Sequence, residues 1–136
     1  MKVLLTLMAV LEATVGLALL VSPALPASIL LGAPLDTPAG LTVGRVAGSA
    51  LLALGIACWR VRQEGRSHSA NGVVTSMMFY NVFVVATLLY AQLRLGVKGI
   101  GIRPAVFLHV VLALWCITCV IGPASPTNAE TSVRRT

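Results

Sequence analysis

The sequence predicts an all-α integral membrane protein: a four-helix bundle with antiparallel, up-down topology. Of the 136 residues, 57% are hydrophobic and 10% are charged, and the mean hydropathy is +0.93. A soluble domain carries roughly 25% charged residues, so the four carboxylates of this chain are too few to cover a water-exposed surface. The apolar residues also gather in four long runs. We therefore expect lipid to be the solvent for most of the chain.

Each of the four apolar runs is long enough to cross a bilayer as a helix. Crossing roughly 30 Å of hydrocarbon takes about 20 helical residues, and a helix satisfies its own backbone polar groups. The expected spans are residues 3–21, 41–59, 73–93 and 105–122, which together form one domain over residues 1–122. Their ends are marked by Pro23, Pro26, Gly40, Gly72 and Pro104. Residues 123–136 are polar, and we expect them to form a disordered tail.

Two segments near the N-terminus need a choice between interpretations. Residues 3–21 follow Lys2 and precede small residues, as in a cleavable signal sequence. This run is longer than the usual apolar core of roughly 7–15 residues, and Glu12 lies in its middle, so we interpret it as the first span. The connection over residues 22–39 contains the apolar stretch 29–31 between prolines, for which we expect a short interfacial segment.

The basic residues predict the orientation. One side of the bundle would carry six of them and the other side three, and the more basic side stays in the cytoplasm. Both termini are therefore expected to be cytoplasmic, in a multi-pass protein of a bacterial-type inner membrane. The basic residues are spread over loops rather than gathered on one face, so no nucleic-acid partner is expected. The six are Lys2, Arg60, Arg62, Arg66, Arg134 and Arg135, and the three are Arg94, Lys98 and Arg103.

Four polar side chains fall inside the spans, one on each helix: Glu12, Arg45, Asn81 and His109. An ionisable group inside a membrane is costly and is by default a functional hypothesis. At 1.5 Å rise per residue, Glu12 lies about 15 Å below the outer end of its helix. Arg45 and His109 lie about 6–8 Å below theirs, and an arginine side chain can reach across that offset. We therefore expect one polar network of these four residues.

Small residues predict where helices approach closely. Gly44 and Gly48 form a G-x-x-x-G pair on the second span, and Gly16 shares a face of the first span with Glu12 by its spacing of four. Small residues on such faces let two backbones come together in a membrane. We expect Gly16, Gly44 and Gly48 to serve helix packing, and Tyr80 to be a candidate ligand contact.

Each polar or reactive residue also has a purely structural interpretation. A Glu12–Arg45 pair would hold two helices in register, His109 would be a satisfied core histidine, and Asn81 would join helices. Cys58, Cys116 and Cys119 are surrounded by apolar residues, which suits small hydrophobes better than reactive thiolates; a redox pair is the alternative. We expect no metal site, no catalytic residue and no cofactor, although a bound quinone or lipid remains open.

In layout, residues 3–122 resemble the small four-helix DoxX-like bacterial membrane proteins. The resemblance rests on the stretch Leu30–Gly32 after the prolines, the run Gly44–Gly48, the Tyr80–Asn81 dipeptide and His109 on the last helix. Many members of this group are uncharacterised, and some are membrane partners of redox enzymes. The resemblance implies four helices and a role beside such an enzyme.

A second resemblance is to the small multidrug transporters. These proteins are similar in length, have four helices and carry a single glutamate in the first helix, as Glu12 does here before Gly16. The third span here lacks their glycine-rich dimerisation motif, and Arg45 would neutralise the glutamate. Only Glu12 therefore carries over from this family, as a coupling residue.

Three functions follow as hypotheses. The first is a non-enzymatic accessory or structural subunit of a membrane complex, with a redox-linked complex as one version. This hypothesis suits the short loops and small-residue faces. The second is a proton-coupled transporter built from several copies of the chain, with Glu12 as the coupling site. The third is a quinone- or lipid-binding protein in which His109, Arg45 and Tyr80 hydrogen-bond the ligand. The expected partners are the bilayer and either further copies or other membrane subunits.

Overall fold

The computed structural model describes residues 1–122 and contains five α-helices and, within those residues, no strand. The helices are α1 (Lys2–Val21), α2 (Ala24–Leu31), α3 (Pro38–Val61), α4 (His68–Arg94) and α5 (Ile102–Ile121). All except α2 are long and apolar enough to cross a membrane. The all-α class and the four apolar helices are therefore confirmed. The expected tail, residues 123–136, lies outside the described residues.

Two helices, α3 and α4, start earlier than the positions of Gly40 and Gly72 indicated, because polar side chains cap their N-termini. The Thr37 side chain accepts a hydrogen bond from the backbone N–H of Gly40 at 3.0 Å, so α3 begins at Pro38. The Ser67 side chain accepts from the backbone N–H of Ala70 at 3.0 Å, so α4 begins at His68. These contacts satisfy backbone donors that the first turn leaves free. Gly40 and Gly72 consequently lie inside helices.

Prolines also fall inside helices where the backbone tolerates them. Pro104 is the third residue of α5, and Pro26 is the third residue of α2. The first turn of a helix has no internal partner for its N–H groups, so a proline there loses no hydrogen bond. The short segment expected between residues 22 and 39 is thus the helix α2, which ends at Gly32 in the left-handed conformation with φ of 79°.

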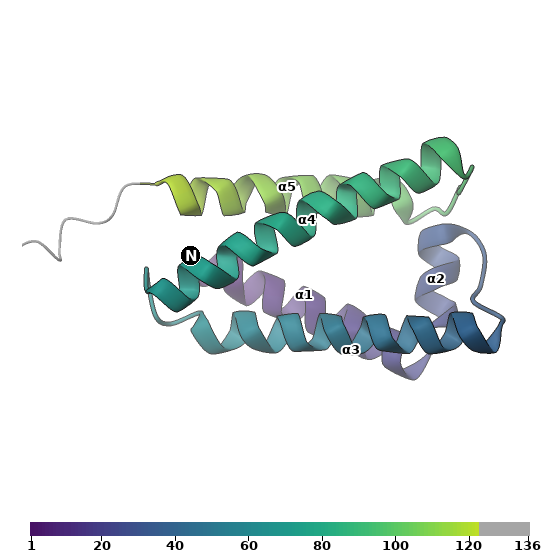
Figure 1. Cartoon of the computed structure of the whole chain (residues 1–136), viewed down its shortest axis with the longest axis horizontal. Helices are drawn as coiled ribbons and strands as arrows, with labels where there is room; N and C mark the ends of the chain where they lie inside the picture. The colour runs from purple at the N-terminus through teal and green to yellow at the C-terminus, as the bar shows by residue number, and fades with distance from the viewer. Residues whose placement is uncertain (123–136) are drawn as a thin grey trace, which may run out of the picture.

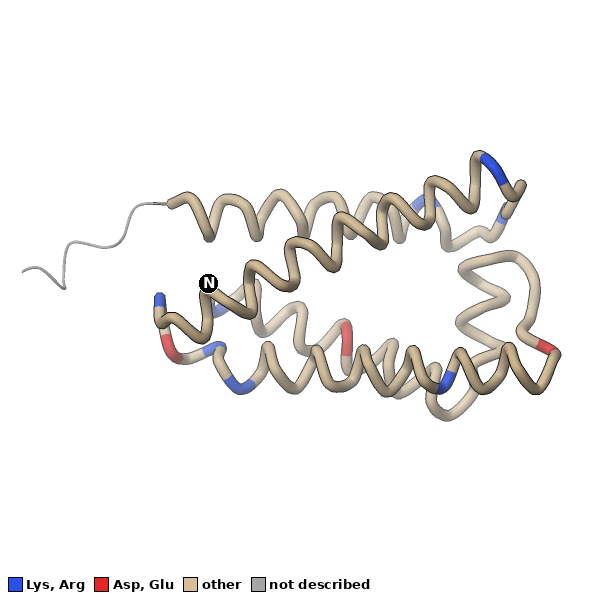
Figure 2. The backbone as a smooth tube through the Cα atoms, in the orientation of Figure 1, with Lys and Arg blue, Asp and Glu red and all other residues tan. Residues whose placement is uncertain are grey.

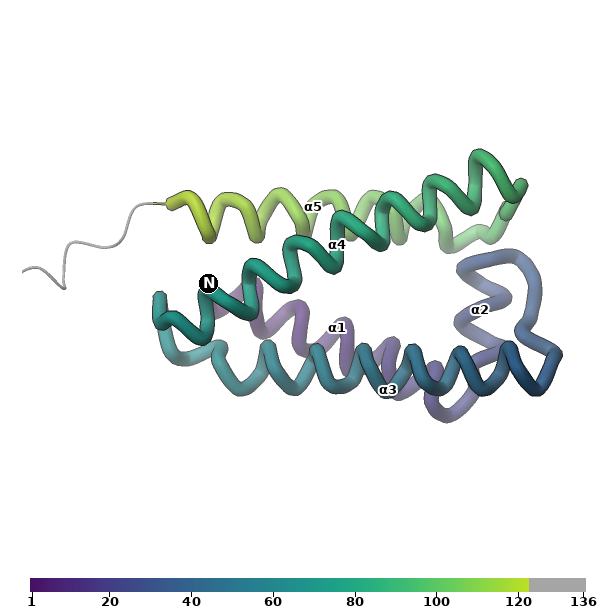
Figure 3. Tube along the Cα trace, viewed as in Figure 1, coloured from purple at the N-terminus to yellow at the C-terminus, as the bar shows by residue number. Residues whose placement is uncertain are grey.

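The long helices form two pairs. α1 packs along α3 and α4 packs along α5, whereas contacts between the two pairs are far fewer. Figure 1 shows α3 returning alongside α1, and α5 returning alongside α4. α4 begins next to the end of α3 and diverges from it toward its own C-terminal end (Figure 3). At that far end α2 stands between the pairs, and the N–H of Gly101 donates to the carbonyl of Ile29 at 2.9 Å.

The main cluster of buried hydrophobic residues lies in one half of the molecule. It comprises the N-terminal halves of α1 and α4 and the C-terminal halves of α3 and α5, and its members come from all four long helices. At this end Arg66, in the loop between α3 and α4, donates to the carbonyls of Gly122 and Cys119. These are carbonyls at the C-terminal end of α5, which a cation stabilises. The core residues are Leu4, Leu5, Met8, Ala9, Cys58, Val61, Ala70, Val74, Met77, Leu112 and Cys116.

Most of the charged residues lie toward the two ends of the bundle (Figure 2). The long apolar surfaces between those ends are exposed in the single chain, including Val43, Phe83 and Phe107 at 68%, 66% and 72% of their surface. Monomeric soluble proteins rarely expose continuous apolar surface of this extent. The distribution is that of helices whose outer faces contact lipid.

Candidate functional site

Glu12 is a buried acid in the middle of α1. It is only 5% exposed, and it follows the core residues Met8 and Ala9 on the same helix. Its carboxylate accepts a hydrogen bond from the Tyr80 hydroxyl of α4 at 3.3 Å. This bond joins the α1–α3 pair to the α4–α5 pair. The acid therefore sits where the packed core ends, on the boundary between the two pairs.

Asn81 is fully buried and joins α4 to α5. Its Nδ2 donates to the carbonyl of Met77, one turn earlier, at 2.6 Å, and its Oδ1 lies 2.7 Å from Nδ1 of His109. Because Oδ1 can only accept, His109 must donate from Nδ1. The hydrogen-bond pattern thus assigns the proton to Nδ1 in the neutral ring and leaves Nε2 as an acceptor.

Tyr80 connects these two interactions. Its ring meets the His109 ring edge to face, with centroids 5.9 Å apart, while its hydroxyl reaches Glu12. We call Glu12, Tyr80, Asn81 and His109 the polar cluster. Within residues 1–122, every fully buried side-chain nitrogen and oxygen has a hydrogen-bond partner. The cluster therefore spans three helices and satisfies its own buried groups.

The structure does not bring Arg45 to this cluster, which corrects the expected four-residue network. Arg45 is exposed on α3 and makes no ion pair with Glu12 in the part of the chain described. The reason is helical geometry: its neighbour Gly44 faces Pro23 and Leu35, and one residue turns the side chain by about 100°.

The predicted packing glycines lie at close backbone contacts. A Cβ atom at Gly16 would lie 2.7 Å from the carbonyl oxygen of Gly48, and one at Gly48 would lie 2.7 Å from that of Gly16. Gly44 has the Pro23 ring against it, where a Cβ would lie 2.7 Å from Pro23 Cβ. The absence of side chains at Gly16 and Gly48 is what allows α1 and α3 to touch.

The cysteines lie in the apolar core or pack against it. Cys58 and Cys116 are free thiols buried in the core, and Cys119 is a free thiol that is partly exposed. Among residues 1–122, no three His, Cys, Asp or Glu side chains are placed to hold a metal ion. Whether Cys116 and Cys119 act as a redox pair stays a hypothesis.

An apolar groove of about 490 Å³ lies between α1, α2 and α3. Its walls are aliphatic side chains, one proline and two glycines, with no member of the polar cluster among them. A ligand in this groove would therefore meet neither Tyr80 nor His109, the residues expected to hydrogen-bond a quinone. The lining includes Val15, Leu19, Leu30, Leu35, Val43 and Ala47.

The chemical capacity of the cluster follows from its free atoms. Glu12 can take up and release a proton, and Nε2 of His109 can accept a hydrogen bond. The role of Tyr80 as the partner of Glu12 was not predicted, because it depends on how α1 and α4 are placed against each other. In the sequence, the position of Tyr80 next to Asn81 was the one feature that pointed to a role for Tyr80 in the site.

Comparisons with known protein families, with curated proteins and with solved structures found no match to this chain.

Proposed function

We propose that α1, α3, α4 and α5 cross a bacterial-type inner membrane in antiparallel, up-down order, with both termini in the cytoplasm. Support comes from the four apolar helices and from the basic residues, six on the side of the termini and three on the other. A phosphatase reporter that works only outside the cytoplasm should be inactive when fused after Thr136 and active when fused after Gly96. The reverse pattern would contradict this orientation.

We further propose that the protein is a non-enzymatic accessory or structural subunit of a membrane complex. The observation that carries this proposal is the self-satisfied polar cluster: Asn81 is fully buried and both of its polar atoms are bonded within the protein. Buried polar groups that bond to one another fix how helices pack rather than wait for a substrate. A redox-linked complex is the version that the DoxX-like layout suggests, and membership in that group stays a prediction.

Native mass spectrometry of the protein, released gently from its own membrane, tests this proposal. The expected result is a heteromeric mass. Glu12→Gln should reduce the heteromeric fraction, because it changes the buried group that meets Tyr80. The matched control is Asp36→Asn, the same chemical change at an exposed position, which should leave the fraction unchanged. A mass that contains copies of this chain alone would contradict the proposal.

Proton-coupled transport is a second candidate, and one observation favours it. Glu12 has Tyr80 rather than Arg45 as its partner, so the cation expected to neutralise it does not do so. In that case native mass spectrometry should give a homo-oligomer, and proteoliposomes should take up cationic dyes when a pH gradient is imposed. Uptake that persists in Glu12→Gln would exclude Glu12 as the coupling residue.

A further inference from the structure

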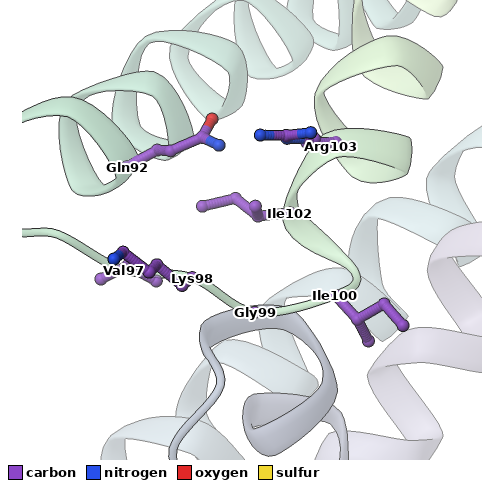
Figure 4. A pocket seen from close by; sticks show the side chains of 7 residues that line it. All are labelled: Gln92, Val97, Lys98, Gly99, Ile100, Ile102 and Arg103. Carbon is purple, nitrogen blue, oxygen red and sulfur yellow. The ribbon is translucent and has the colours of Figure 1, made fainter.

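A pocket of about 430 Å³ lies at the end of the bundle where α4 connects to α5. It is separate from the polar cluster and from the apolar groove. Gln92 of α4 and Arg103 of α5 extend toward each other across it, with Ile102 between them (Figure 4). Lys98 and the loop backbone at Gly99 form its lower side in this view. The pocket thus combines two cations and an amide with apolar walls.

Within residues 1–122, the cations of this pocket form no ion pair with an acidic residue. The sequence contains no Asp or Glu from Gly65 to Gly122. Asp36, the acid in the connection between α2 and α3, forms no ion pair with Lys98 or Arg103 in the part of the chain described. Two unneutralised cations that share a pocket attract an anion, and the planar guanidinium of arginine suits phosphate oxygens. The Gln92 amide adds hydrogen-bond donors on the opposite side.

The loop that carries this pocket is fixed to α2. The N–H of Gly101 donates to the Ile29 carbonyl at 2.9 Å, and a Cβ atom at Gly99 would overlap the Leu30 carbonyl. Close backbone contact of this kind requires glycine at position 99. Lys98 and Arg103 are therefore held on either side of an anchored segment, which lowers the entropy cost of binding.

The position of the pocket identifies the source of the anion. It lies at the ends of two candidate spans, at the level where phospholipid headgroups meet the protein. Ile100, which lines the pocket, is 87% exposed, so an apolar side chain is available there to lipid tails. We propose that this pocket binds the phosphate group of an anionic phospholipid, with Lys98, Arg103 and Gln92 as its ligands. The proposal rests on the proposed membrane crossing of α4 and α5, but not on the proposed accessory role.

Native mass spectrometry of the full chain in detergent, titrated with phosphatidylglycerol, tests the proposal. Lys98→Ala/Arg103→Ala should weaken the binding of phosphatidylglycerol at least about tenfold, since basic residues at a membrane surface each contribute to the attraction. The control Arg45→Ala/Arg60→Ala removes the same charge from exposed positions outside the pocket and should change binding less than about twofold. Equal losses in the two variants would overturn the proposal, because only overall charge would then matter.

Two further measurements complete the test. One distinguishes binding in the pocket from nonspecific binding of lipid to the protein surface, and the other distinguishes a phospholipid from free phosphate as the ligand. Gln92→Glu keeps both cations but places a carboxylate against the bound phosphate, and it should also weaken binding of phosphatidylglycerol. Unchanged binding in this variant would overturn the assignment of the pocket. Zwitterionic phosphatidylcholine should bind more weakly than phosphatidylglycerol. Inorganic phosphate that binds as tightly as phosphatidylglycerol, and competes with it, would overturn the lipid as the source.

Discussion

Gly48→Ile is expected to destabilise the protein by about 3 kcal/mol or more, because it separates α1 from α3. A Cβ atom at position 48 would lie 2.7 Å from the Gly16 carbonyl oxygen and 2.9 Å from the backbone nitrogen of Leu20. Both are backbone atoms of α1, so no side-chain rotation can relieve the overlap. Overpacking a well-packed contact typically costs about 1–3 kcal/mol, and occasionally more. The measurement is the free energy of unfolding in lipid bicelles.

Gly72→Ile is the matched control for this substitution. Gly72 also lies inside a long helix, α4, but a Cβ atom there would have nothing within 4 Å. Both substitutions change the helix propensity of one position in the same direction, so the comparison isolates the contact. The expected change for Gly72→Ile is within about 0.5 kcal/mol. A similar loss of stability in both variants would refute close α1–α3 contact at Gly48.

Asn81→Leu is expected to destabilise the protein by about 1–3 kcal/mol. The substitution keeps a side chain of similar size but removes the acceptor 2.7 Å from Nδ1 of His109. It also removes the donor to the Met77 carbonyl. Leaving one partner of a buried hydrogen bond unsatisfied costs about that amount. Unfolding in lipid bicelles gives the magnitude.

Asn71→Leu provides the control on the same helix. Asn71 is exposed in the second turn of α4, so the same chemical change should alter stability by no more than about 0.5 kcal/mol. If Asn71→Leu were as costly as Asn81→Leu, the loss would reflect asparagine on this helix in general. The hydrogen bond between Asn81 and His109 would then contribute nothing specific to the free energy of unfolding.

The long helices could be predicted from the sequence because hydropathy is a local property. Runs of about 20 apolar residues specify spans whatever packs against them, and all four were found. Their first residues were placed three to five positions late at Pro38 and His68, because Thr37 and Ser67 cap those helices. Glycine and proline were taken to mark helix ends, but both residue types also occur within the first turns of these helices, where the backbone tolerates them.

The site was harder to predict because it depends on how helices are rotated about their axes. The spacing of small residues placed Glu12 toward a neighbouring helix, whereas Asn81 and His109 were expected in the network because polar side chains inside a span are costly. Arg45 was expected beside Glu12 on grounds of depth alone. In the structure Gly44 faces Pro23, Gly48 faces α1, and the side chain of Arg45 is exposed. The pairing of Tyr80 with Glu12 joins residues 68 positions apart, and no local pattern specifies it.

The central claim is that the polar cluster is a set of side chains that satisfy one another and thereby hold the helices together. A double-mutant cycle of Asn81→Leu and His109→Leu, read as unfolding free energy in lipid bicelles, tests it most directly. Each single variant leaves one buried partner unsatisfied, whereas the double variant leaves neither. The double variant should therefore cost at least about 1 kcal/mol less than the sum of the two single variants. Additive costs would contradict the claim and would mean that Asn81 and His109 do not depend on each other.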